Sequence, residues 1–440
     1  MLTLCVAGDI ILMAPIPAEY GAESESLRKY ILAADMRISN MESTISNYDQ
    51  FASTFCGGSW LTVPSYILKE LDAFGFQYYS FANNHSMDYS YGGLMSTMQA
   101  LEEHGVLCGG AGRSLSEATA PAVLRHEGQK VGIISVTATC DDAARAGDAS
   151  HKIPARPGVN MLRHSETFAV NEAHMQALKE IAEATHINGR INNSKRGGYT
   201  VDNPDVFQLG SLFFTLCDEE GKRSVPHAGD ALRITNSIRE AKKTMDYVVI
   251  YLHSHEIKGE TDDEPDYFLE TFSRQCIDAG AAAVICSGTH QIKAVEVYKG
   301  APILYSIANF IFQSDLVSEV PKDFYDKYNV PFHYTAAEAI GVRSANGTRG
   351  LQTDINNYMG IVPTLHMEDG KVKRVILQPT ELCFYMGKAM KGLPRVADSE
   401  TAQWIYNRIQ KLSRPYGTKL IRNGDLIEIV LPGSAGVPTL

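Results

Sequence analysis

The chain has 440 residues, of which 44% are hydrophobic and 21% charged, as in ordinary globular proteins. At roughly 150 residues per domain, this length favours two to three domain-sized units. The net charge of −11 argues against a nucleic-acid partner, because such proteins normally present a basic face. An anionic or peptide-like substrate stays open, since a bound metal ion can supply local positive charge.

The cysteines and the hydrophobic runs indicate the compartment. The eight cysteines form no C-x-x-C pair and several lie in apolar runs, so we expect buried free thiols in a reducing cytoplasm. Residues 1–7 are typical of a first strand rather than of a signal peptide. No apolar run reaches the ~18–20 residues of a membrane span. The sequence predicts a soluble, cytoplasmic protein and leaves its oligomeric state open.

The first 150 residues alternate short apolar runs with amphipathic patterns. Strands are predicted over Leu2–Ala7, Met36–Ser39, Tyr78–Ala82 and Lys130–Val136, and helices over Leu27–Ala34, Ser65–Phe74 and Gly92–His104. Continuous apolar strands between helices are typical of a mostly covered sheet in a layered α/β fold.

The middle of the chain, about 142–245, departs from this pattern. We expect an inserted segment here, forming a lid over the site, with helices over Phe168–Ala184 and Asp230–Lys243 around a polar stretch. The α/β pattern then resumes with strands over Tyr247–Leu252, Ala282–Cys286 and Pro302–Ile307 and a helix over Asp266–Ala279.

The last 120 residues differ again and predict an α+β extension that packs on the main domain, which gives a division into 1–320 and 321–440. Tyr358–Met367 and Lys371–Gln378 flank an Asp-Gly pair, which is a strong signal for a β-hairpin. A helix over 400–413 and a strand over Leu426–Leu431 follow. The chain shows no internal repeat.

Polar side chains recur where predicted strands end, which in α/β sheets is the edge that binds ligands. Those strand ends carry Asp9, Glu42, Asn84 with His85, His253 with His255, and His290. Each taken singly has an ordinary structural explanation, such as a turn, a helix cap or solvated surface. Their recurrence at five strand ends predicts one divalent-metal site.

The ligand types indicate which metal this site would take. Carboxylate, amide and imidazole ligands without thiolates suit Mn, Fe or Zn in preference to Mg, and their number allows one ion or two. A histidine that does not bind the metal can act as general acid towards the substrate. We assign that role to His85, with Asp88 orienting it by accepting its ring N–H.

The order of these motifs resembles the CapA family of poly-γ-glutamate capsule biosynthesis proteins, in the calcineurin-like metallophosphoesterase superfamily. The resemblance covers about residues 1–315 and is carried by Gly8-Asp9, Asn40-Met-Glu42, Asn83-Asn84-His85-Ser-Met-Asp88, His253, Thr289-His290 and Tyr305-Ser-Ile-Ala-Asn309-Phe. It implies a four-layer α/β/β/α sandwich. It also implies metal ligation by Asp9, Glu42, Asn84, His253 and His290, with His85 and Asp88 as the acid pair.

The chain departs from the family pattern at two places. His253-Ser254-His255-Glu256 stands where the family usually has His-Trp-Gly, and Gly288-Thr-His290 stands where it usually has Gly-His-x-Pro-His. One ligand histidine is therefore missing unless His255 replaces it. The number of bound ions depends on this residue.

A second conspicuous segment opens the predicted insertion. Arg156-Pro-Gly-Val-Asn160-Met-Leu-Arg163 places two arginines around a Pro-Gly turn. Arginines in this arrangement bind carboxylate or phosphate groups, although a solvated charged loop is the simpler reading. We list Arg156, Asn160 and Arg163 as candidate substrate-binding residues.

Three functions remain open from the sequence. The first is a metal-dependent hydrolase acting on a phosphoester or on an amide or γ-glutamyl-type bond in poly-γ-glutamate or capsule metabolism. The second is a non-catalytic accessory protein that binds a polymer or peptide. The third is a metal-dependent peptide epimerase. The motifs favour the hydrolase.

Overall fold

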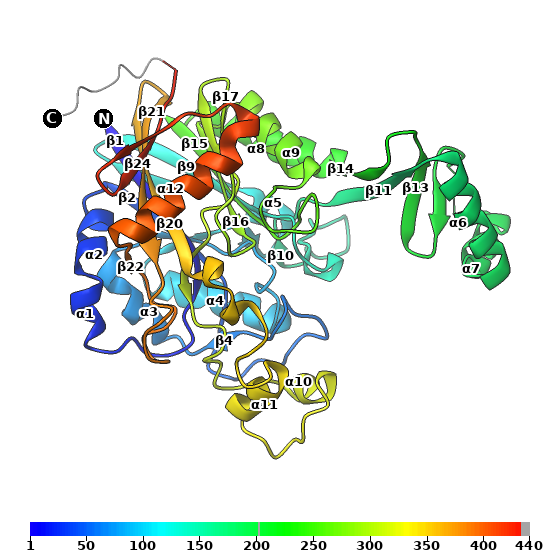
Figure 1. Cartoon of the computed structure of the whole chain (residues 1–440), viewed down its shortest axis with the longest axis horizontal. Coiled ribbons are helices and arrows are strands. Elements are labelled where there is room, and N and C mark those ends of the chain that lie inside the picture. Colours follow the sequence, from blue (N-terminus) through cyan, green and yellow to red (C-terminus); the bar gives the residue numbers. More distant parts are fainter. Residues whose placement is uncertain (201–202, 433–440) are drawn as a thin grey trace.

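Two large sheets dominate the computed structural model, which describes residues 1–200 and 203–432 (Figure 1). The first sheet has ten strands in the order β23-β24-β21-β20-β1-β2-β5-β6, with β19 beside β1 and β22 beside β21. The second has six, in the order β17-β18-β16-β15-β9-β8. The predicted mixed α/β class is therefore confirmed.

The first sheet grows from β1 (Leu2–Ile11), which continues four residues beyond the predicted strand. The strands β2 (Met36–Met41) and β19 (Asn309–Phe312) pair in parallel with β1, and β5 (Tyr78–Ser80) and β6 (Leu107–Gly109) follow β2 in the same direction. The connecting helices are α2 (Glu25–Leu32), α3 (Ile67–Leu71) and α4 (Ser90–Glu103). The three helices, β2 and β5 lie within a few residues of their predicted ranges, whereas β6 and β19 were not predicted.

The second sheet is built from four parallel strands, β9 (Gln129–Thr137), β15 (Tyr247–Ser254), β16 (Ala283–Gly288) and β18 (Ala301–Leu304). Two strands pair antiparallel at its margins, β8 (Ala122–His126) and β17 (Val295–Tyr298). Helices α8 (Ala228–Lys242) and α9 (Tyr267–Ala279) join its strands, as the sequence predicted.

Side chains of β1 point alternately into two cores, because successive residues of a strand face opposite sides. Leu4 and Val6 belong to a cluster shared with Ile133 of β9 and Val249 of β15. Cys5 and Ala7 belong to the cluster that contains residues of α2 and α3. A third cluster joins the other face of β9 and β15 to α8 and α9. Burial on both faces explains why these strands are continuous apolar runs.

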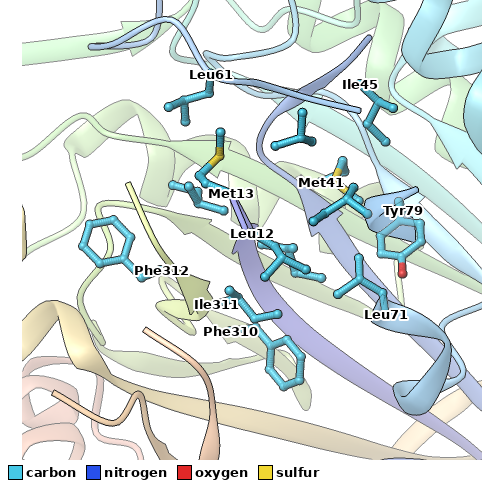
Figure 2. Packing of buried hydrophobic residues seen from close by; sticks show 14 of the residues in the cluster. Leu12, Met13, Met41, Ile45, Leu61, Leu71, Tyr79, Phe310, Ile311 and Phe312 are labelled. Carbon is cyan, nitrogen blue, oxygen red and sulfur yellow. The ribbon is translucent and has the colours of Figure 1, made fainter. Parts of the chain in front are cut away.

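Buried hydrophobic side chains gather around the end of β1 and the neighbouring β19 (Figure 2). Leu12 and Met13 extend the strand into the same buried cluster as Phe310 and Phe312. The ring of Phe310 meets Phe74 edge-to-face, with centroids 4.9 Å apart. Fully burying side chains of this size stabilises the fold by about 1.5–3 kcal/mol each. The end of the strand that carries Asp9 is therefore held in place by buried hydrophobic side chains.

The C-terminal residues extend the first sheet. β20 (Met359–Glu368) pairs with β21 (Lys371–Glu381) as the predicted hairpin and also runs antiparallel to β1. Asp369 and Gly370 both have positive φ, the turn conformation that Asp-Gly favours. Strands β22 (Arg395–Val396), β23 (Leu420–Asn423) and β24 (Leu426–Ile429) and helix α12 (Ser399–Ser413) complete this part. The predicted division near residue 320 stays a prediction.

The part of the chain from β11 to β14 forms a lobe that projects from the rest of the molecule (Figure 1). It holds β11 (His164–Val170), α6 (Glu172–Thr185), α7 (Gly189–Arg196), β12 (Phe207–Leu209), β13 (Leu212–Leu216) and β14 (Gly221–Pro226). The predicted helix over Phe168–Ala184 is wrong at its start. Phe168–Val170 end β11, and the side chain of Asn171 caps α6 by accepting a hydrogen bond from the His174 N–H.

Within 1–200 and 203–432, no helix is long and apolar enough to cross a membrane.

Candidate metal centre

The pairing register brings the polar strand ends of both sheets together. Asp9 on β1 lies level with Asn40 on β2 and with Asn309 on β19. In the second sheet, Ser254 at the end of β15 pairs with Gly288 at the end of β16. The loops that follow these residues carry Glu42, His255 and His290. The carboxyl ends of parallel strands from both sheets thus surround one site, as expected for a ligand site in an α/β protein.

Five of the six predicted ligands form two groups that share Glu42. Asp9, Glu42 and His253 form one, and Glu42, His255 and His290 form the other, with potential ligand atoms within 4.8 Å of one another in each group. Glu42 Oε1 lies 3.6 Å from His253 Nε2 and 3.9 Å from His255 Nε2. The sixth, Asn84, places Oδ1 2.8 Å from His253 Nε2.

Glu42 provides the test of whether these residues fit a cation. Its side chain is wholly buried, and neither carboxylate oxygen has a hydrogen-bond partner among the described residues. Burial, with Asp9 and Asp88 nearby, raises the pKa of Glu42 well above its usual value. A buried carboxylate without a partner is costly. A divalent cation between Glu42 and the histidines would satisfy both oxygens, so the residues fit a metal ion.

Burial favours the neutral form of His255 and His290, which is the form that binds metals. Burial lowers the pKa of His290 to about 4 and that of His255 well below its usual value. His290 Nδ1 lies 2.8 Å from Asn309 Oδ1, and Asn309 donates through Nδ2 to the Asn357 carbonyl over 2.9 Å. This contact orients the His290 ring in the way that outer partners orient metal-ligating imidazoles.

Two asparagines that had no predicted role, Asn40 and Asn83, connect Asp9 with the His85 loop. Asn40 donates through Nδ2 to Asp9 Oδ1 over 2.8 Å, and Asn83 donates through Nδ2 to Asn40 Oδ1 over 3.1 Å. The Asn83 Oδ1 accepts from the His85 backbone N–H over 3.0 Å. Asn40 and Asn83 belong to the same strand-end motifs as the predicted ligands, and that position was the available signal.

The acid pair has the geometry that the sequence predicted. His85 Nδ1 lies 2.7 Å from Asp88 Oδ2, and both side chains are buried. Asp88 also accepts from the backbone N–H groups of Gly57 and Leu61, over 2.9 and 2.8 Å. Gly57 accepts in turn from Asn84 Nδ2 over 2.8 Å. The loop that contains Gly57 and Leu61 therefore fixes both Asp88 and the side-chain amide of Asn84. The sequence did not indicate this role of the loop.

A cavity of about 760 Å³ opens beside this centre. Its lining includes Asn84 and His255 from the centre and residues from the first part of the inserted segment. Of the candidate substrate-binding residues, Arg163 lines the cavity. Arg156 is exposed and donates to the Arg145 carbonyl. Asn160 is wholly buried and bonded to the Ser135 carbonyl and to Arg233. Substrate contact by these three residues stays a prediction.

Fold and site together define an α/β protein with a candidate metal centre at the carboxyl ends of its strands. The family model described as "Bacterial capsule synthesis protein PGA_cap" matches residues 3–314. The chain belongs to this family of bacterial capsule synthesis proteins, and the predicted resemblance to CapA is confirmed.

Relatives extend the match over nearly the whole chain. Two proteins of Sinorhizobium fredii, y4sH and y4uA, both described as uncharacterized, are 29% identical over 95% of this chain and 90% of their own length. The capsule biosynthesis protein CapA of Bacillus anthracis is 22% identical over 71% of this chain and 60% of its own. The PGA biosynthesis protein CapA of Bacillus subtilis is 37% identical over 17% of this chain and 19% of its own.

The close approach of Gly57 to the acid pair can be tested by adding one methyl group. A Cβ at Gly57 would meet Asn84 Nδ2 at 2.6 Å and the His85 ring at 2.8 Å. We expect Gly57→Ala to lower the free energy of unfolding by about 1–3 kcal/mol, the usual cost of overpacking. Gly21→Ala is the control, since nothing lies within 4 Å of its Cβ. Equal effects in denaturant titrations would contradict the assignment.

The depressed pKa of His290 makes the stability of the metal-free protein depend on pH. Between its ordinary pKa of 6.5 and about 4, the unfolded chain binds a proton that the folded chain excludes. The stabilisation is therefore present above pH 6.5 and is lost as the pH falls towards 4, by up to about 3 kcal/mol. Unfolding in chelator at pH 7 and pH 4.5 should show a smaller loss for His290→Gln than for wild type. Equal losses would show that His290 is already protonated in the folded protein.

Proposed function

We propose that this protein is a metal-dependent hydrolase that cleaves an amide or γ-glutamyl-type bond, or a phosphoester, in capsule-related metabolism. The observation that carries the proposal is the wholly buried Glu42 carboxylate, unpartnered among the described residues and shared by two groups of potential ligands. We interpret the two facing sheets and their outer helices as the four-layer sandwich that the family resemblance implies.

The ligand assignment follows the two groups. Asp9, Glu42 and His253 would hold one ion, and Glu42, His255 and His290 a second, with Asn84 contributing its amide oxygen. In this arrangement His255 takes the place of the histidine that the family pattern has and this chain lacks. The oxygen and nitrogen donors suit Mn, Fe or Zn. Such an ion, when bound, supplies Lewis-acid polarisation of the substrate and lowers the pKa of a water molecule.

The residues of the chain supply the proton chemistry. His85 is held by Asp88 through Nδ1, which leaves Nε2 to donate a proton to the leaving group as the scissile bond breaks. Asp88 is fixed in turn by two backbone N–H groups, so the imidazole keeps one orientation. Asn84, next in sequence to His85, ties the acid to the ligand set through its contact with His253.

Metal content tests the role of His255. We expect purified wild type loaded with Mn²⁺ to retain more ions per chain by native mass spectrometry than His255→Ala, because the variant loses one of the three donors of the second group. His104→Ala is a matched control, since His104 pairs with Asp72 outside the site. Identical stoichiometry in wild type and His255→Ala would remove His255 from the ligand set.

Catalysis by His85 is tested with Mn²⁺-loaded protein and a panel of γ-glutamyl anilides, peptides and phosphoesters. Losing a general acid should lower kcat by about 10²–10⁴-fold in His85→Ala, while the bound metal is retained. His104→Ala again serves as the control. A wild type inert towards the whole panel, or a His85→Ala variant as active as wild type, would contradict the hydrolase.

The departure from the family pattern at His253-Ser254-His255 favours one alternative, a non-catalytic accessory protein that binds a polymer or peptide. Such a protein would bind oligo-γ-glutamate equally well after His85→Ala and after metal removal. The peptide epimerase and the cytoplasmic location also stay predictions; deuterium uptake from solvent into a candidate peptide would reveal the epimerase.

A further inference from the structure

The cavity beside the metal centre has a strongly acidic wall. Asp141, Asp142 and Glu256 line it. Asp141 accepts a hydrogen bond from the Ala143 N–H within its own turn, over 2.9 Å. In the part of the chain that the structure describes, neither Asp141 nor Asp142 forms an ion pair within 4 Å, so both carboxylates remain available to a ligand in the cavity.

Glu256 is held in place by neutral donors. Its carboxylate accepts from the hydroxyl of Thr139 over 2.8 Å and from that of Ser254 over 2.6 Å. The buried Lys293 behind it donates to the Glu256 backbone carbonyl, over 3.4 Å, rather than to the carboxylate. The Glu256 side chain is therefore fixed at the cavity wall without a direct salt bridge.

Arg163, which lines the cavity, is already paired with a carboxylate. Arg163 donates to Asp230 through Nε over 2.7 Å and through Nη2 over 3.2 Å. This pairing offsets the guanidinium charge, so the wall as a whole remains negative. A polyanion entering the cavity would be repelled, because like charges brought together disfavour binding.

The same cavity reaches the candidate metal centre. Asn84 and His255 line it, and the wholly buried Glu42 carboxylate, which has no hydrogen-bond partner among the described residues, lies beyond His255, with Oε1 3.9 Å from Nε2. A substrate in the cavity would meet the metal centre at one end and the acidic wall at the other.

We propose that the substrate is an amide that carries an ammonium group near the scissile bond, which Asp141, Asp142 and Glu256 attract. The inference rests on the proposed hydrolase and specifies its substrate class. Each interior residue of a γ-linked glutamate chain carries a free carboxylate and no amine, so the cavity disfavours such a chain. Amine-bearing peptides, including the amino end of a peptide, are favoured.

A matched pair of chromogenic amides tests this charge preference in the Mn²⁺-loaded protein. We expect a higher kcat/KM for lysine p-nitroanilide, which carries two ammonium groups, than for glutamate p-nitroanilide, whose single ammonium group is offset by a carboxylate. The double variant Asp141→Asn/Asp142→Asn should reduce this ratio by about threefold to tenfold, as expected for two exposed charges. Asp218→Asn, on the projecting lobe, should leave it unchanged. The preference should also weaken with added salt.

The failure of this inference can be distinguished from failure of the proposed function. Faster cleavage of the glutamate amide, or a ratio unchanged in the double variant, would overturn the charge preference while leaving a hydrolase. If neither amide is cleaved, calorimetry with lysine amide and glutamate amide decides. Tighter binding of lysine amide that is lost in the double variant supports the inference without hydrolysis, and equal binding overturns it.

Discussion

A buried carboxylate that lacks any hydrogen-bond partner within the described structure is the constraint on which the site depends. Glu42 follows β2 in the interior, where an ionised side chain is stable only beside a compensating charge. The imidazoles of His253 and His255 lie within 4 Å of this carboxylate, and the nearby Asp9 makes the charge imbalance worse. A metal ion would resolve this imbalance, and such an ion requires neutral histidines, which burial favours for His255 and His290.

The fold accepts local strain to bring these ligands together. Gly8 precedes Asp9 where β1 meets β19, and a Cβ there would lie 1.9 Å from the Ala308 carbonyl oxygen. His290 and Ala308 both have left-handed backbone conformations, which non-glycine residues seldom adopt. Such strain persists where the surrounding structure determines the geometry, as it commonly does at functional sites. The buried aromatic cluster under β19 supplies that support.

The sequence predicted most successfully those elements whose structure follows from a single residue pattern. Buried parallel strands had to be apolar runs, so β1, β15 and β16 could be predicted, and Asp-Gly marked the turn before Lys371. The candidate ligands could be predicted because each lies at, or shortly after, the carboxyl end of such a strand. Phe168 was misplaced because a strand and a capped helix follow each other there without a glycine or proline between them. The contacts of Gly57 with Asn84 and Asp88 join segments about 30 residues apart through backbone groups, which leave no signature in the side-chain pattern.

The charge of the cavity likewise emerged only from the folded chain. Asp141 and Glu256 are more than a hundred residues apart in the sequence. Arg156 and Arg163, which flank a Pro-Gly pair, are more conspicuous there. Pairing of Arg163 with Asp230 changes the expected substrate, because a neutralised guanidinium no longer dominates the cavity. Family membership identifies a capsule-related protein; the side chains around the cavity point to the chemistry on which this member acts.

In the site that we propose, a metal ion balances the charge of Glu42. The most direct test compares the free energy of unfolding of wild type and Glu42→Gln, each in chelator and in Mn²⁺. In chelator, the neutral glutamine should be as stable as glutamate or more so, because it removes a buried unpaired carboxyl group. In Mn²⁺, wild type should become the more stable protein, because tight binding to the folded state stabilises it. If Mn²⁺ stabilises both proteins equally, or neither, the account of this site is contradicted.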